Sequence, residues 1–222
     1  MVGEPPNGSP KSWFLGQGRG GWEEGFRNSS RLTREAVAMQ CAGEDHSPTM
    51  RFQCATCGEE HDLAELSLGS DAPAQWDFIG EEERGDSLLS SDQCVIRTKD
   101  ETSFFLRACL DIPIQGTEDF FSWGVWVSLS EKSFDGVHDS WRDERRAELG
   151  PFFGWLCTAI PGYPDTMFLK TSVQLRPIGL RPLVELEPTE HALAVHQREG
   201  IGATELRELV GPLLHDPESE EQ

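Results

Sequence analysis

The sequence predicts an α+β domain with a mainly antiparallel β-sheet, C-terminal helices and an N-terminal C-x-x-C knuckle. Two observations predict this class. Short runs with the alternation of β-strands crowd into the middle of the chain, whereas helical patterns gather toward its C-terminus. Strands and helices therefore do not alternate as they would in a parallel α/β sheet.

The first 50 residues differ in composition from the rest. They are rich in Gly, Pro and Ser without periodicity, which predicts a disordered leader over residues 1–50. Within it, residues 32–40 have the composition of a short helix. A second interpretation takes Met50 as the true start and the leader as a mis-assigned one. We expect a single domain over residues 51–215 and an acidic disordered tail over residues 216–222.

The predicted sheet begins with a hairpin. Residues 93–98 and 103–114 are strand-like runs on either side of a Lys-Asp-Glu-Thr turn. Residues 119–130 predict a third strand, and its apolar residues on both faces favour a central position. Trp123 and Trp126 lie three residues apart on this strand, so they should point to opposite faces. On the second strand, one apolar face should be formed by Phe104, Leu106, Ala108 and Leu110.

The next elements are shorter. Residues 130–149 predict a helix with Ser130 as its N-cap. The apolar run 151–160 fits either a strand or a short helix. Residues 167–176 and 182–188 predict two further strands.

Two helices are expected to end the domain. Residues 189–200 should form the first, with Thr189 as its N-cap and Gly200 as its stop. Residues 203–215 should form the second.

The net charge of −20 limits the classes of partner. Nucleic acids and anionic membranes are disfavoured, because binding them needs a basic surface. A basic protein partner, attracted by the acidic field, is the expected alternative. The chain has neither an apolar run long enough to span a membrane nor a secretion-signal pattern, so we expect a cytoplasmic protein.

A C-x-x-C pair is the main chemical motif. Cys54 and Cys57 have the spacing with which one tight turn presents two thiolates to zinc. Gly58 suits such a turn because glycine adopts positive φ. His61 lies four residues past the second cysteine and could bind the same ion. The sequence therefore predicts a zinc ion as cofactor.

The fourth zinc ligand must come from elsewhere, and Cys94 and Cys109 are the candidates. A redox function is disfavoured, because Glu59, Glu60 and Asp62 would raise the pKa of the thiols. The remaining alternative is that the cysteines are ordinary packed or exposed thiols.

Other candidate residues have ordinary structural explanations. His191, in the first turn of a predicted helix, could be a base or ligand but more commonly caps or packs. His196 follows five residues later, which is not a one-face ligand spacing. Arg107 interrupts an apolar strand, so it should pair with Asp111 or another carboxylate, or bind an anionic ligand. Asp165 is expected to be a turn residue.

Several longer stretches resemble a known bacterial family. The strings CATCGEEH, FFLRACLDIP, PGYPDT and RPLVELEPTEHALAVHQREGI resemble the domain-of-unknown-function family 2199 over about residues 51–215. The resemblance implies a small soluble bacterial protein without an established activity, so it assigns no catalytic residues. The chain departs from the family pattern at Ala108, usually Gly, and His196, usually Glu. The residues at family positions that imply a shared site are Cys54, Cys57, His61, Cys94 and Cys109.

Two functional hypotheses follow. The first is a non-enzymatic acidic protein with a structural zinc site held by Cys54, Cys57, His61 and Cys94, acting through protein contacts. By analogy alone, an immunity role that neutralises a toxin fits its size and acidity. The alternative is a zinc-dependent enzyme using Cys54, Cys57 and His61, with Glu60 as the base.

Overall fold

The computed structural model describes residues 32–34, 51–53, 58, 60–62 and 68–215. In this part of the chain, nine strands join one sheet in the order β1-β4-β8-β9-β10-β11-β7-β6-β5, and β2 and β3 form a separate hairpin. The strands are β1 (Leu32–Arg34), β2 (Arg51–Gln53), β3 (Glu60–Asp62), β4 (Leu68–Ser70), β5 (Leu88–Leu89), β6 (Gln93–Arg97), β7 (Thr102–Pro113), β8 (Phe120–Leu129), β9 (Phe152–Leu156), β10 (Lys170–Gln174) and β11 (Leu183–Leu186).

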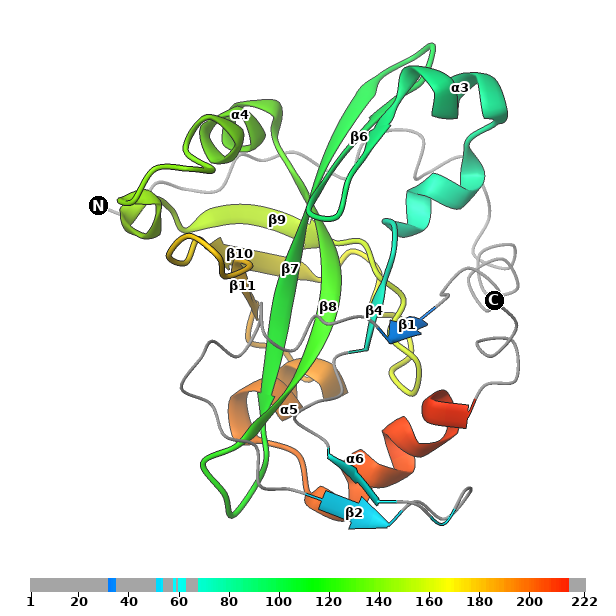
Figure 1. Cartoon of the computed structure of the whole chain (residues 1–222), viewed down its shortest axis with the longest axis vertical. Coiled ribbons are helices and arrows are strands. Elements are labelled where there is room, and N and C mark those ends of the chain that lie inside the picture. Colours follow the sequence, from blue (N-terminus) through cyan, green and yellow to red (C-terminus); the bar gives the residue numbers. More distant parts are fainter. Residues whose placement is uncertain (1–31, 35–50, 54–57, 59, 63–67, 216–222) are drawn as a thin grey trace.

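Five of these strands close on themselves as a barrel. β7 and β8 are antiparallel along ten residue pairs and run the length of the molecule (Figure 1). β9, β10 and β11 follow as antiparallel neighbours, and β11 returns to β7 in parallel at Leu183 and Cys109. The sheet's outermost strands are β1 and β5, three and two residues long, and such short edges limit pairing with other chains.

Helices lie toward both ends of the long strand pair (Figure 1). At one end Phe134 packs on Phe104, with their ring centroids 5.2 Å apart. At the other end Ile114 forms a bridge with Ile201, just before α6. No helix in residues 68–215 is long and apolar enough to span a membrane. The helices of this region are η2 (Ala74–Phe78), α3 (Glu81–Asp86), α4 (Glu131–Asp139), η3 (Arg146–Glu148), α5 (Ala192–Glu199), α6 (Ala203–Val210) and η4 (Gly211–His215).

The two faces of β7 and β8 build two cores. The larger core contains Trp123 and side chains from the barrel strands, α4, α5 and α6. The smaller one, on the opposite face, contains Trp126, Phe105 and Cys94. The prediction that the two tryptophans point to opposite faces is therefore confirmed, and both are fully buried. Trp126 satisfies its indole N–H by donating to the Ser70 carbonyl at 2.8 Å.

The predicted fold class is confirmed as a mixed α+β domain with a sheet-rich core. The hairpin forms as β6 and β7, and the third strand forms as β8 in a central position. The apolar run 151–160 contains strand β9, the first of its two alternatives. The barrel closure and the parallel pairings of β4–β8 and β11–β7 were not predicted.

The helix predicted over residues 130–149 ends ten residues earlier than expected. Ser130 is its N-cap, as predicted, and accepts a hydrogen bond from the Ser133 N–H at 3.2 Å. At the other end the Ser140 hydroxyl donates to the Gly136 carbonyl at 2.8 Å. Such local hydrogen bonds compete with helix propagation, and turns and η3 follow.

Other boundaries also differ. Helix α5 begins at Ala192 with His191 as its N-cap, so the prediction of Thr189 was wrong. The Thr189 hydroxyl instead accepts from the His191 N–H at 3.3 Å, which delays the first turn. The short helix expected from residue 32 is also wrong for Leu32–Arg34, because β1 pairs with β4 there. The division of the chain at residue 50 stays a prediction.

Replacing a leucine inside the larger core should cost far more stability than replacing an exposed one. Leu106 is fully buried and Leu88 is half exposed. We expect Leu106→Ala to lower the free energy of unfolding by roughly 2–5 kcal/mol. The matched control Leu88→Ala should change it by less than about 0.5 kcal/mol. Urea denaturation followed by circular dichroism measures both, and equal losses would contradict the assignment of the core.

Candidate functional site

Strands β9, β10 and β11 present an outer surface with aromatic groups on one side and acidic groups on the other. The strand register places Phe153 opposite Ser172 and Ser172 opposite Glu185. One row further, Trp155 lies opposite Lys170, whose carbonyl accepts the Glu187 N–H at 2.9 Å. The outward-facing residues of this surface are Phe153, Trp155, Lys170, Ser172, Glu185 and Glu187.

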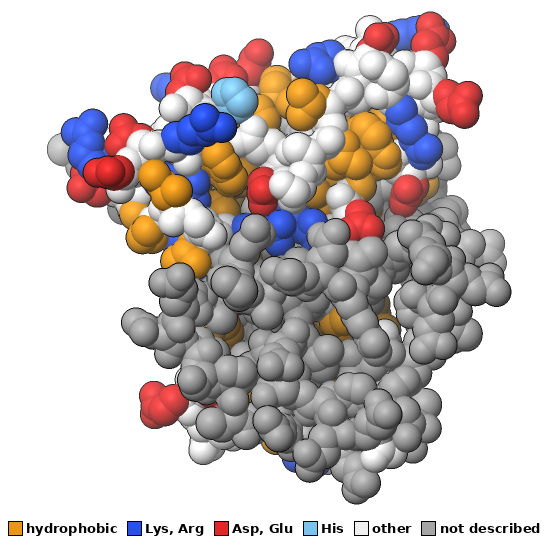
Figure 2. Space-filling view, viewed as in Figure 1, with side chains coloured by type: hydrophobic (Ala, Val, Ile, Leu, Met, Phe, Trp, Pro, Cys, Tyr) orange, Lys and Arg blue, Asp and Glu red, His pale blue; other side chains and the backbone are white. Residues whose placement is uncertain are grey.

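The aromatic side of this surface is accessible. Phe153 is 36% exposed and lies edge-on to the half-buried Trp155, with their ring centroids 5.2 Å apart. On the face drawn in Figure 2, apolar side chains also reach the surface in patches among acidic and basic ones. Exposed aromatic groups of this kind are common in protein-binding surfaces.

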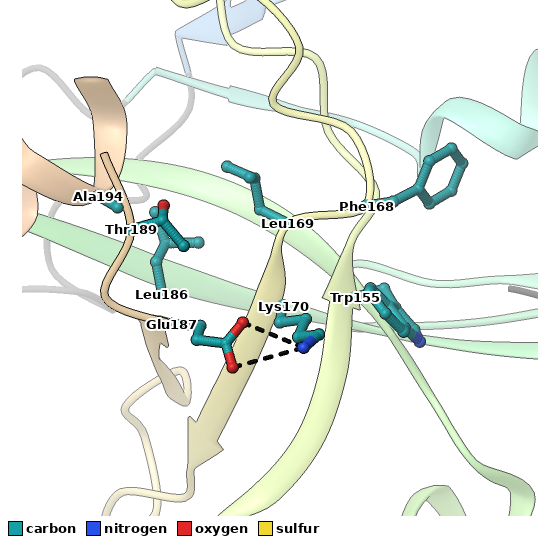
Figure 3. A pocket seen from close by; sticks show the side chains of 8 residues that line it. All are labelled: Trp155, Phe168, Leu169, Lys170, Leu186, Glu187, Thr189 and Ala194. Atoms are coloured by element: carbon teal, nitrogen blue, oxygen red, sulfur yellow. Dashed lines mark hydrogen bonds and ion pairs between the residues drawn. The ribbon is translucent and has the colours of Figure 1, made fainter. Parts of the chain in front are cut away.

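A groove of about 210 Å³ opens at one end of this surface. In Figure 3, Trp155 and Phe168 lie to the right of Lys170, and Leu186, Thr189 and Ala194 lie to the left. The groove thus lies between β9, the start of β10 and the connection from β11 to α5. Its lining residues are Trp155, Phe168, Leu169, Lys170, Leu186, Glu187, Thr189 and Ala194.

An ion pair lies at the rim of the groove. Lys170 Nζ lies 3.2 Å from Glu187 Oε2, and both side chains are about half exposed, 49% and 51%. An exposed pair of this kind contributes little to folding stability. The two charges are therefore accessible to a binding partner.

Phe168 directs the chain into the groove through an unusual backbone conformation. Its φ of 63° lies in the left-handed region, which is uncommon for a bulky residue. The Phe168 N–H donates to the Leu156 carbonyl, and the Leu156 N–H donates to the Leu169 carbonyl, both at 2.8 Å. These two bonds fix the conformation next to β9. Asp165 also has a positive φ, 54°, in a turn, as predicted for that residue.

Three arginines, two in the loop between β10 and β11 and a third 30 residues before it, fix this loop. Arg146 donates to the Arg176 carbonyl at 2.6 Å and to the Trp141 carbonyl at 2.9 Å, with its guanidinium over the Trp141 ring. Arg176 donates to the Arg181 carbonyl, and Arg181 pairs with Asp92 at 2.8 Å. Burial lowers the pKa of Arg146, and the Asp92 charge acts in the opposite direction.

Arg107, Cys109 and Asp111 are alternate residues of β7 and lie on one of its faces. Arg107 is only 2% exposed, and Asp111 accepts a hydrogen bond from the Ser122 hydroxyl at 2.7 Å. The pairing of Asp111 with Arg107 stays a prediction. Asp111 also lies near Arg176, whose pKa it acts to raise against the effect of burial. Cys109 is buried and disulfide-bonded.

Cys94 is a free, fully buried thiol in the smaller core. Burial raises its pKa to about 12. A second free thiol, Cys157, lies in the same core and accepts a hydrogen bond from Gln75 at 3.3 Å. Burial raises the pKa of Cys157 to about 11. Both side chains therefore remain protonated thiols at neutral pH.

The predicted zinc ligands Cys54 and Cys57 lie outside the described residues, and of His61 only the backbone is described. Strands β2 and β3 pair Phe52 with His61, so the C-x-x-C segment connects two paired strands. Gly58 has the positive φ expected of it, 74°. In the part of the chain that the structure describes, no three His, Cys, Asp or Glu side chains are grouped to hold an ion.

The predicted zinc ligands come from the segment around β2 and β3 and from β6. The β2–β3 hairpin lies toward the same end of the long strand pair as α6, whereas β6, which carries Cys94, lies toward the opposite end (Figure 1). The zinc site itself stays a prediction.

The histidine that caps α5, His191, and His196 within α5 hold the loop that precedes β10. His191 contacts the Pro164 carbonyl through Nε2 at 2.7 Å and accepts the Leu193 N–H through Nδ1. His196 contacts the Tyr163 hydroxyl through Nδ1 at 2.8 Å. Burial raises the pKa of Tyr163. The contacts of His191 agree with the capping and packing function weighed for it.

Comparison with known families agrees with the resemblance seen in the sequence. Residues 53–201 match the family DUF2199, described as an uncharacterized protein conserved in bacteria. The chain belongs to this family. The DUF2199 match includes β6 to β11, and with them the groove and the arginine network. No curated protein and no solved structure matches the chain.

The buried thiols should resist alkylation while the protein is folded. Iodoacetamide reacts with thiolates, and the raised pKa values keep Cys94 and Cys157 protonated at about pH 8. We expect mass spectrometry to find both residues unlabelled in native protein and labelled in denaturant. Because burial raises these pKa values on folding, the folded state favours the protonated thiols. Their contribution to folding stability is therefore complete below about pH 8.5 and is lost as pH rises toward 12. Rapid labelling of the native protein would contradict their burial.

Proposed function

We propose that this protein is a non-enzymatic binding protein that acts through contacts with a basic protein partner. The observation that carries the proposal is the outer surface of β9, β10 and β11, where exposed aromatic residues adjoin acidic ones. Aromatic anchors commonly dominate the binding energy of protein interfaces, and complementary charge increases the association rate.

The charge of the whole chain supports the same partner class. A net charge of −20 gives the molecule an acidic field, which attracts basic proteins and repels polyanions. The surface itself is carried by strands that are paired on both sides in the barrel, so its residues have fixed positions. A preorganised surface loses little conformational entropy on binding.

We further propose that the β2–β3 hairpin holds a structural zinc ion through Cys54, Cys57 and His61. The pairing of strands around the C-x-x-C segment and the positive φ of Gly58 support this. Cys94 could be the fourth ligand only if β6 met the hairpin, and the two lie toward opposite ends (Figure 1).

Zinc content separates these assignments. Freshly purified protein should contain about one zinc ion per chain by plasma mass spectrometry, and Cys57→Ser should lose it together with folding stability, because metal binding and folding are coupled in a structural site. Cys94→Ala tests the remaining ligand, and we expect its zinc content to equal that of the unchanged protein. Zinc-free native protein would exclude the metal site, and loss of zinc in Cys94→Ala would restore Cys94 to the ligand set.

Capture from a bacterial host lysate tests the binding function. The protein should retain a basic partner at low salt and lose most of it as ionic strength rises, because exposed charges are screened. Replacing Trp155 with alanine should weaken retention roughly tenfold or more, as loss of an interface hot spot does. Phe78→Ala is the matched control at another exposed aromatic residue. Retention that changes neither with ionic strength nor in Trp155→Ala would contradict the proposal.

A further inference from the structure

The groove beside Trp155 is large enough to bind one side chain. Its volume of about 210 Å³ is below the roughly 300–1,000 Å³ of most small-molecule and cofactor sites. Its walls are mainly apolar, with Trp155 and Phe168 on one side and Leu186 on the other. This combination fits one apolar side chain better than a cofactor.

The charges around the groove favour a basic neighbour of that side chain. Lys170 is the cation of the lining, and it is paired with Glu187. Glu185 lies on the same outward face as Glu187, and Glu190 follows the lining residue Thr189; both are exposed. Three glutamates against one lysine leave the rim negative. A segment with lysine or arginine beside its apolar anchor is therefore complementary to it.

The closed barrel also restricts how the segment is recognised. β9, β10 and β11 are each paired on both sides, so these strands offer no free edge for strand addition. Recognition must therefore depend on side chains. The left-handed Phe168 and its hydrogen bonds next to β9 keep one wall of the groove in place without a ligand.

We propose that this groove binds one large apolar side chain of a lysine- or arginine-rich segment of the partner protein. The inference rests on the proposed function and assigns its contact point. The apolar side chain fills the groove, and the flanking basic groups lie against Glu185, Glu187 and Glu190.

Short peptides test the recognition directly. The probe is acetyl-Arg-Leu-Arg-amide, titrated into isotope-labelled protein while the backbone amide signals of Lys170, Glu187 and Thr189 are followed by NMR. Acetyl-Arg-Ala-Arg-amide should bind roughly tenfold more weakly, because it lacks most of the apolar area of leucine. Acetyl-Glu-Leu-Glu-amide should also bind more weakly, because its charges oppose those of the rim.

Two variants at the rim should act in opposite directions. Glu187→Gln should weaken binding of the Arg-Leu-Arg probe roughly two- to fivefold, and Lys170→Gln should strengthen it by a similar factor. Both side chains are half exposed, so thermal denaturation should show unchanged folding. Glu118→Gln, at an exposed position in the β7–β8 turn, is the control and should change nothing.

The results separate this inference from the proposed function. If the Arg-Leu-Arg probe leaves the groove signals unchanged, or if the two rim variants shift its affinity in the same direction, the assigned contact point is wrong. The binding function would still stand if the lysate capture depended on salt and Trp155. If the probe binds as expected but no partner is captured, the groove is confirmed as a basic-peptide site and the proposed function fails.

Discussion

The pairing of β7 with β8 is the interaction on which the rest of the structure depends. It joins ten residue pairs without interruption, and its two faces are buried in different cores. One face builds the larger core with the helices at its ends. The other face carries Phe105 and Trp126 and is covered by the segment around η2, whose Ala74 N–H donates to the Cys157 carbonyl. A break in this pair would expose both cores at once.

The charged groups also differ between the surface and the interior of the molecule. The surface is strongly acidic, yet the buried ionic groups include the arginines Arg107, Arg146 and Arg181. Most of the hydrogen bonds that Arg146 makes go to backbone carbonyls, so its guanidinium serves as a structural connector between segments. Planar, multiply donating arginine suits this use better than lysine. The acidic exterior remains available for attraction of a partner.

The sequence could predict the parts of the fold that depend on local pattern. Alternation predicted β6, β7 and β8, and a capping serine predicted the start of α4. The barrel closure could not be predicted, because it depends on one parallel contact between Cys109 and Leu183, distant in sequence. The groove was missed for the same reason. Trp155, Lys170 and Glu187 have no shared motif, and only the strand register places them in one row.

The strands of the barrel are not all paired over the same length, because β11 and β7 share a single register pair. Apart from the Leu183–Cys109 contact and the hydrogen bond from the Cys109 N–H to the Pro182 carbonyl at 2.8 Å, the described ladder between these strands is short. Every other junction of the barrel is a longer antiparallel ladder. This junction is therefore a seam, along which the cylinder can open into a curved sheet while β7 and β8 stay joined. The Cys109 amide hydrogen, which donates across the seam to the Pro182 carbonyl, would then exchange with solvent in a sub-global opening, well before the amide hydrogens of the β7–β8 ladder.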